Sequence, residues 1–121
     1  MAAADHDPTA FLPLSAPVFH VLVSLADGDR HGYAIIKGIA DRTDGAQRLG
    51  AGTLYAILKR LLDDGLIDEV GMARAHGDDQ RRRYYRLTPL GRLVARAEVD
   101  RLEQAVASAR ESRLFGRPRP A

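Results

Sequence analysis

The side chains best suited to chemistry lie together on one stretch of the chain, residues 50–65. Tyr55 and Lys59 are four residues apart, so they would be neighbours on one face of a helix, with Thr53 and Arg60 on the same side. A hydroxyl, a phenol, an ammonium and a guanidinium near a helix N-terminus could contact phosphates and base edges. The plain alternative is the solvated face of an ordinary surface helix, and this stretch alone favours that alternative.

Arginines form a second cluster farther along the chain. They are Arg74, Arg81, Arg82, Arg83, Arg86 and Arg92. The formal net charge is only +2, so the total charge says little about a partner. A basic patch on a nearly neutral protein indicates a local anionic partner, whereas a solvated arginine surface is the alternative.

Catalytic and metal-binding patterns are missing from the sequence. The histidines His6, His20, His31 and His76 are scattered singly, and no two of them have the i, i+4 spacing of a metal-binding pair. With 0 Cys there is no thiolate ligand. Residues 50–52, Gly-Ala-Gly, lack the spacing of a dinucleotide fingerprint or a P-loop. We therefore expect no enzyme, no cofactor and no metal site.

The length and composition indicate one soluble globular domain. A chain of 121 residues can build one modest core, and 45% hydrophobic with 28% charged residues is ordinary for such a domain. No apolar run approaches the roughly 20 residues of a membrane span. The N-terminus lacks a basic start and an apolar run, and the chain lacks cysteine, so we expect a cytoplasmic protein.

The elements that would position residues 50–65 follow from the apolar spacing. Leu54, Ile57, Leu58, Leu61 and Leu62 form one stripe of a helix, which Gly65 would end in a left-handed conformation. Two short helices precede it, one capped by Ser15 with Pro17 in its first turn, the other beginning near residue 31. Short helices with tight connections are typical of a helix-turn-helix.

After residue 65 the period changes from helix to strand. Residues 66–70 and 81–87 read as two strands joined by a loop with glycine, which predicts a hairpin. Alternation places Arg83, Tyr85 and Leu87 on one face of the second strand. A hairpin directly after a recognition helix, with arginines at its base, is a wing. The predicted fold is therefore mainly α with a small β-hairpin: a winged helix-turn-helix domain plus a long C-terminal dimerisation helix.

The last helix is predicted to start at the Thr88 cap with Pro89 in its first turn and to run to about residue 113. Leu90, Leu93, Val94 and Ala97 would cover the domain. A later coiled-coil spacing, together with off-stripe residues of the first helix, predicts a dimer interface made of Phe19, Val23, Ala95, Val99, Leu102, Val106 and Ala109. The expected parts are a flexible N-terminal arm (1–14), the winged helix domain (15–88), the dimerisation helix (89–113) and a disordered basic tail (114–121).

Four blocks of sequence give this chain a resemblance to a known family. They are His31-Gly32-Tyr33-Ala34-Ile35-Ile36, Gly52-Thr53-Leu54-Tyr55, Leu58-Lys59-Arg60-Leu61 with Asp64-Gly65-Leu66-Ile67, and Arg82-Arg83-Tyr84-Tyr85-Arg86-Leu87-Thr88 with Gly91. In their order and spacing these blocks resemble the PadR family of bacterial transcriptional regulators, over about residues 15–113. The short C-terminus resembles the subgroup with a single long C-terminal helix.

The resemblance implies a homodimer that binds pseudo-palindromic operator DNA, represses transcription, and is released by a small-molecule effector bound between the subunits. It implies that Tyr33 and Tyr55 contact the DNA backbone and that Gly52, Thr53 and Lys59 lie at the major groove. Arg82 and Arg83 match the basic entry to the second wing strand, and with Arg81 they are expected to contact DNA.

Two positions depart from the family pattern. Gly50 stands where a serine N-cap is common, and Ala56 stands where proline often follows the tyrosine. Glycine in place of such a cap costs only a few tenths of a kcal/mol, so the helix is still expected. The alternative function is a winged-helix module that binds another protein and no DNA, because a fold does not fix a function.

Overall fold

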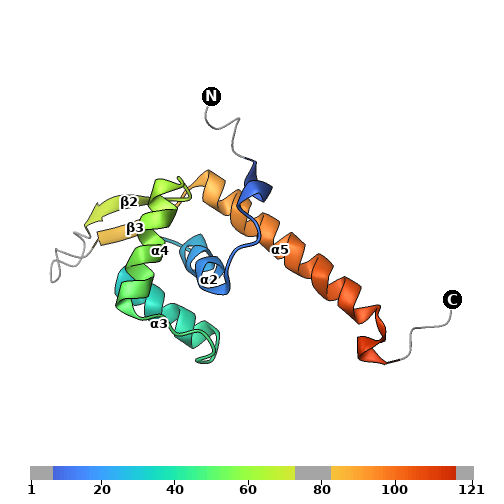
Figure 1. The fold of residues 1–121 in the computed structure, drawn as a ribbon. Helices are drawn as coiled ribbons and strands as arrows, with labels where there is room; N and C mark the ends of the chain where they lie inside the picture. The colour runs from blue at the N-terminus through green and yellow to red at the C-terminus, as the bar shows by residue number, and fades with distance from the viewer. Residues whose placement is uncertain (1–6, 73–82, 117–121) are drawn as a thin grey trace.

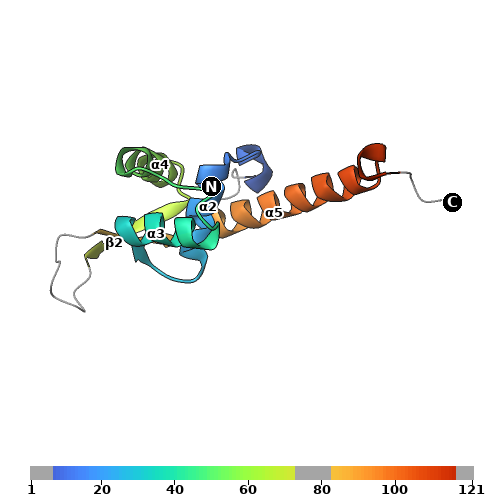
Figure 2. The ribbon, with the colours of Figure 1, turned by 90° about the horizontal axis from the view of Figure 1, so that it is seen from below.

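The computed structural model describes residues 7–72 and 83–116. Its helices are α2 (Ala16–Ala26), α3 (Gly32–Arg42), α4 (Ala51–Asp63) and α5 (Pro89–Arg110), its 3-10 turns are η1 (Pro8–Phe11) and η2 (Arg113–Phe115), and its strands are β1 (Arg30–His31), β2 (Ile67–Met72) and β3 (Arg83–Leu87). Helices α2, α3 and α4 gather with the strands at one end of the molecule, and α5 extends from them in both views (Figures 1 and 2). The predicted fold class, a winged helix with a long C-terminal helix, is confirmed.

Capping side chains explain where most of the helices begin. The hydroxyl of Ser15 accepts from the Val18 N–H at the start of α2, and Thr88 Oγ1 accepts from the Gly91 N–H at the start of α5. Both caps were predicted. Gly65, directly after α4, has a φ of +77°, the left-handed conformation expected there.

The sheet has three strands in the order β1-β3-β2, and both pairings are antiparallel. The hairpin was predicted, but β1 was not, because a strand of two residues leaves no alternating pattern in the sequence. Tyr85 and Leu87 of β3 are buried and Arg86 is exposed, as the alternation predicted. The predicted first two residues of this strand, 81 and 82, lie outside the described residues.

One apolar core joins all the helices to the sheet. It consists of Val21, Leu22, Leu25, Ile35, Ile39, Leu49, Leu54, Leu58, Leu61, Leu66, Ile67, Tyr85, Leu87 and Val94. Each fully buried aliphatic side chain contributes about 1.5–3 kcal/mol relative to an exposed one. The core therefore fixes α4 by its inner stripe and leaves its other face outside.

The start of α5 packs directly on the corner between α4 and β2. A Cβ at Gly91 would overlap the backbone carbonyl oxygen of Leu66, so only glycine allows this approach. The Thr88 N–H donates to the same oxygen at 3.1 Å, and Thr88 Oγ1 donates to the Gly65 carbonyl at 2.8 Å. The direction in which α5 leaves the domain is thus set at the end of α4.

The segment before α2 follows a defined course along α5. Phe11, Leu12 and Leu14, in the arm expected to be flexible, are partly buried against the core. The Leu14 N–H donates to Glu98 Oε1 at 3.4 Å, and the buried Glu98 carboxylate receives two bonds from Arg101, at 2.9 and 2.7 Å. Residues 1–6 of the expected arm lie outside the described residues.

Two expectations for α5 need correction. Leu93, predicted to cover the domain, is 50% exposed, because the inner line of the helix runs through Gly91, Val94 and Glu98 instead. The helix ends at Arg110 rather than near residue 113, since the Ser112 hydroxyl donates to the Ala109 carbonyl and accepts from the Leu114 N–H. In the expected tail, residues 114–116 are described and belong largely to η2, whereas 117–121 are not described.

Candidate nucleic-acid interface

Helix α4 divides into a buried and an exposed face, as its sequence predicted. Leu54, Leu58 and Leu61 are buried at 2% exposure or less. The residues expected to meet DNA, Gly52, Thr53, Tyr55 and Lys59, are all exposed. The N-cap Gly50 offers no side chain to the free N–H groups of the first turn. Backbone donors and polar side chains therefore share one open surface.

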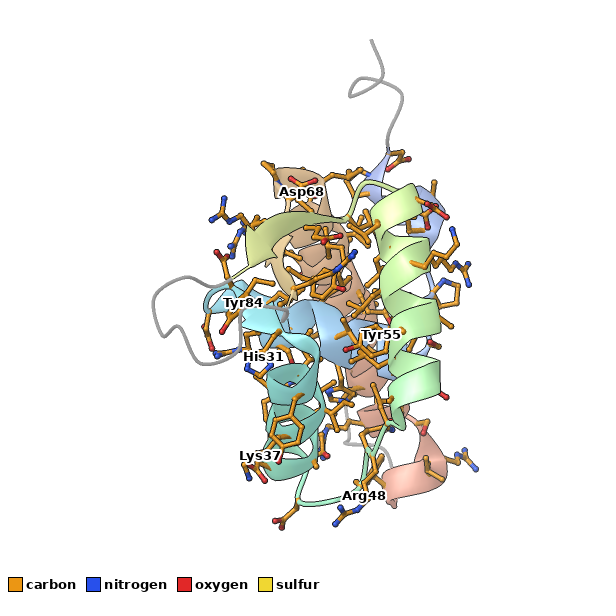
Figure 3. The ribbon with its side chains drawn as sticks, turned by 90° about the vertical axis from the view of Figure 1, so that its left-hand side faces the viewer. His31, Lys37, Arg48, Tyr55, Asp68 and Tyr84 are labelled. Atoms are coloured by element: carbon orange, nitrogen blue, oxygen red, sulfur yellow. The ribbon has the colours of Figure 1, made fainter. Side chains whose placement is uncertain are left out.

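Tyr55 joins α4 to the start of α3. Its ring is 52% exposed, and Figure 3 shows it in the space between the two helices. A Cβ added at Gly32 would lie 2.7 Å from the Tyr55 hydroxyl oxygen, so glycine at position 32 leaves room for the phenol. Two of the sequence blocks that carry the family resemblance thus touch each other in space.

Aromatic rings surround the N-terminus of α3. His31 Nδ1 accepts from the Ala34 N–H at 3.2 Å and caps the helix. The His31 ring stacks on Tyr33 at 6.5 Å between centroids and meets the edge of Tyr84 at 5.2 Å. Tyr33, which the resemblance gives as a DNA-backbone contact, is 63% exposed.

Lys37 belongs to the same surface and was not assigned to it from the sequence. It follows Tyr33 by one helical turn, and that i, i+4 spacing is the signal that could have identified it. A shallow depression of about 450 Å³ on the outer side of α3 is lined by His31, Tyr33, Ala34, Lys37, Gly38 and Asp41. Figure 3 shows His31, Lys37 and Tyr55 on the same side of the molecule.

The arginines at the base of the wing are engaged with acids. Arg83 Nη1 lies 3.2 Å from Glu69 Oε2, and Arg86 makes two bonds to Asp29, at 3.1 and 2.8 Å. The hydrogen bonds from Arg86 lower the pKa of the Asp29 carboxyl, and the same bonds raise the pKa of Arg86. Arg81 and Arg82, the other two predicted wing contacts, lie outside the described residues.

The phenol of Tyr85 links the wing to α4. Burial is the main reason why its pKa is raised, and the nearby Glu69 carboxylate and Tyr55 phenol add to this effect. Glu69 therefore lies close to both Arg83 and Tyr85 in the hairpin.

Residues 7–72 and 83–116 contain no group of three or more His, Cys, Asp or Glu side chains that could hold a metal ion.

His20 is partly buried on α2, where desolvation and then the Arg42 charge lower its pKa. Within the described part of the chain, no helix is long and apolar enough to cross a membrane.

The seven residues expected at a dimer interface lie on α2 and α5. Val99, Leu102 and Val106 are 39%, 38% and 52% exposed on α5. Ala95 and Ala109 on α5 and Phe19 and Val23 on α2 are partly buried within the single chain. The outer half of α5 projects away from the domain (Figures 1 and 2), and Val99, Leu102 and Val106 stay partly exposed in the single chain.

A family model described as the transcriptional regulator PadR-like family matches residues 21–97. The chain belongs to this family. The matched region runs from α2 into the first half of α5 and contains all four sequence blocks. Membership confirms the resemblance stated from the sequence, and with it the expectation of a regulator rather than an enzyme.

Two relatives of this PadR-like regulator extend the comparison. "Uncharacterized protein X" of Lysinibacillus sphaericus is 33% identical over 72 residues, and a 37.1 kDa protein in transposon TN4556 of Streptomyces fradiae is 40% identical over 79 residues. The matches cover 60% and 65% of this chain, but only 64% and 21% of the relatives.

Solved structures share the fold. A transcriptional regulator from Clostridium thermocellum superimposes with a TM-score of 0.65 at 29% identity, covering 76% of this chain and 87% of that one. A PadR family regulator from Clostridium difficile also gives 0.65, at 25% identity, covering 84% and 100%. Bacillus subtilis PadR, in complex with operator DNA, gives 0.59 at 20% identity, covering 88% and 50%.

Proposed function

We propose that this PadR-like regulator binds operator DNA through the exposed face of α4, the N-terminal half of α3 and the wing. The observation that carries the proposal is that Tyr33 of α3 and Tyr55 and Lys59 of α4 are all exposed, while the other face of α4 is held in the core. Side chains of α4 would read base edges, and Tyr33 with the wing arginines would contact phosphates. Bacillus subtilis PadR, which has the same fold, was solved with operator DNA bound.

We propose further that the chain works as a homodimer on a pseudo-palindromic site. The exposed stripe of Val99, Leu102 and Val106 supports this, because apolar side chains on one side of a projecting helix gain most by pairing with a second copy. Two recognition helices would have to lie about 34–36 Å apart to enter successive major grooves. Helix α5, roughly 33 Å long at 1.5 Å per residue, is of the right size to set that separation.

The dimer is proposed to repress transcription and to be released by a small molecule. Phe19 and Val23 of α2 remain partly exposed, and α2 packs on α5. A ligand held between these residues and the partner's α5 would favour one dimer geometry over another, and so change DNA affinity by population shift.

A protein-interaction module without DNA binding is the second candidate. The observation that favours it is the pairing of Arg83 and Arg86 with acids, which makes the wing base less basic than its sequence. The exposed phenols of Tyr33 and Tyr55 and the exposed ammonium of Lys59 argue against a protein-interaction module.

Selection of bound duplexes from a randomised DNA pool, followed by gel-shift titration at two salt concentrations, separates these candidates. The expected result is an enriched, two-fold symmetric sequence. Lys59→Ala and Arg82→Ala should each weaken its binding and flatten its salt dependence, and Arg82→Ala should reduce the salt slope by about 0.9, the value for one phosphate contact. Arg113→Ala, at the far end of α5, is the matched cationic control (Figure 1). No enrichment would favour the protein-interaction module.

A further inference from the structure

Both lysines of the sequence lie on the exposed faces of α3 and α4, and both are paired with an aspartate one turn later. Lys37 Nζ is 3.5 Å from Asp41 Oδ2, and Lys59 Nζ is 3.3 Å from Asp63 Oδ2. All four side chains are more than 60% exposed. The same arrangement therefore occurs once on each of the two helices that contribute to the proposed DNA-binding surface.

These pairs are poorly placed to stabilise their helices. Asp63 is the last residue of α4, and Asp41 is the last but one of α3. A carboxylate there faces the negative end of the helix dipole. A lysine that precedes its acid by four residues is also the weaker of the two possible orders. Helix stability thus gives only a weak reason for either aspartate.

The two ion pairs weaken the attraction between these lysines and a DNA phosphate. An ammonium already held by a carboxylate gives up that contact, or shares it, when it approaches a DNA phosphate. The carboxylate also repels the phosphate at short range. At the wing base Glu69 holds Arg83 in the same way. Cations are present on the surface, but their attraction for the DNA backbone is reduced.

Resting on the DNA binding proposed above, we propose that Asp41 and Asp63 are specificity-determining residues that weaken binding to DNA of arbitrary sequence. Non-specific binding depends almost entirely on phosphate electrostatics, so it suffers most from paired lysines. In the major groove the pair on α4 remains compatible with bases. Lys59 can donate to guanine O6 and N7, and Asp63 can accept from cytosine N4. The aspartates therefore reduce the affinity for the operator less than they reduce the affinity for non-specific DNA.

The test uses the full chain and two DNA duplexes, one selected by the wild-type protein and one scrambled version of the same composition. Asp41→Asn and Asp63→Asn are measured singly and together by fluorescence anisotropy across a salt series. Each single variant should bind the scrambled duplex about two- to fivefold more tightly. Its salt slope should steepen by up to about 0.9 for each lysine released to a phosphate. The selected duplex should gain less, so that the ratio of the two affinities falls.

Glu111→Gln is the matched control, because it removes the same charge from the exposed far end of α5 (Figure 1). The inference is overturned if the aspartate variants leave the scrambled duplex unchanged, or if Glu111→Gln tightens its binding equally. A Lys59→Ala background should reduce the effect of Asp63→Asn to the part that comes from repulsion between the carboxylate and the phosphate, and it should leave the effect of Asp41→Asn unchanged. Failure of the wild-type protein to select any duplex would instead contradict the proposed function, so the two failures are distinguishable.

Discussion

The proposed dimer interface offers the sharpest quantitative prediction. Leu102 and Val106 are 38% and 52% exposed, and complete burial of such a side chain contributes about 2 kcal/mol. Covering what remains exposed would contribute about 0.8 and 1.0 kcal/mol. In a two-fold symmetric dimer each residue is buried twice, which gives roughly 3.6 kcal/mol as an upper value.

Leu102→Ala with Val106→Ala removes most of this contribution while preserving the helix, since alanine has the highest helix propensity. Because alanine keeps its own Cβ, we expect a loss of about 2–3 kcal/mol. That loss corresponds to a dimer dissociation constant raised roughly 30- to 160-fold. Sedimentation equilibrium over a dilution series measures the constant directly.

Gln104→Ala is the matched control, because Gln104 is exposed and lies on the opposite side of α5 from the stripe. It should leave the dissociation constant unchanged. If the double variant dimerises as tightly as the wild type, the stripe is not the interface. If the circular dichroism of the double variant shows lost helix, the comparison moves to the single variants, each with about half the effect.

Three further predictions concern stability. Gly91→Ala should lower the free energy of unfolding by about 1–3 kcal/mol, because the added Cβ overlaps a backbone carbonyl. Its control Gly38→Ala meets no atom within 4 Å and should raise the free energy of unfolding by roughly 0.5–1 kcal/mol. Glu98→Gln should flatten the acid limb of stability: the Arg101 bonds lower the pKa of Glu98 below its usual 4.5, so the wild type loses this contribution as pH falls below that value. His31→Ala removes the cap of α3 and should lower the free energy of unfolding by about 0.5–2 kcal/mol, with partial recovery in His31→Asn.

Urea denaturation at one fixed protein concentration measures all three, since association would otherwise add a concentration-dependent contribution. Equal stabilities of the two glycine variants would contradict the close approach of α5 to the sheet. An acid limb in Glu98→Gln as steep as that of the wild type would show that other carboxyls dominate it. If His31→Ala and His31→Asn have the same free energy of unfolding, the His31 side chain does not stabilise α3 as a cap.

The parts of the fold that repeat with a regular period could be predicted from the sequence. The stripe of α4 and the alternation of β3 are decided by local burial, so spacing alone reveals them. β1 was missed because two residues show no period. The buried Glu98 was missed because hydropathy places a carboxylate outside. Only the Arg101 guanidinium and a backbone N–H from residue 14, 84 positions away, make its burial tolerable.

For the candidate site, the sequence predicted which residues are exposed better than it predicted their contacts. The exposed positions of Tyr33, Tyr55 and Lys59 agree with the sequence-based roles, whereas the roles themselves rest on the family. A count of arginines predicted a basic wing, yet Arg83 lies against Glu69. Such a pairing depends on the register of two strands, which is not readable from one strand alone.

The glycines of the family blocks mark the places where the elements of the interface meet. Gly32 leaves room for the Tyr55 phenol, which fixes α3 against α4, and Gly91 lets α5 approach the carbonyl that follows α4. The two Thr88 hydrogen bonds close the same corner. Few degrees of freedom remain between α5 and α4, because the joint consists of backbone contacts rather than a flexible linker. A change in the angle between two paired α5 helices would therefore move both copies of α4. The distance between the two copies would change, while each helix would keep its own shape. This geometry makes the spacing of the recognition helices, rather than the fold of either domain, the quantity on which regulation of DNA binding would act.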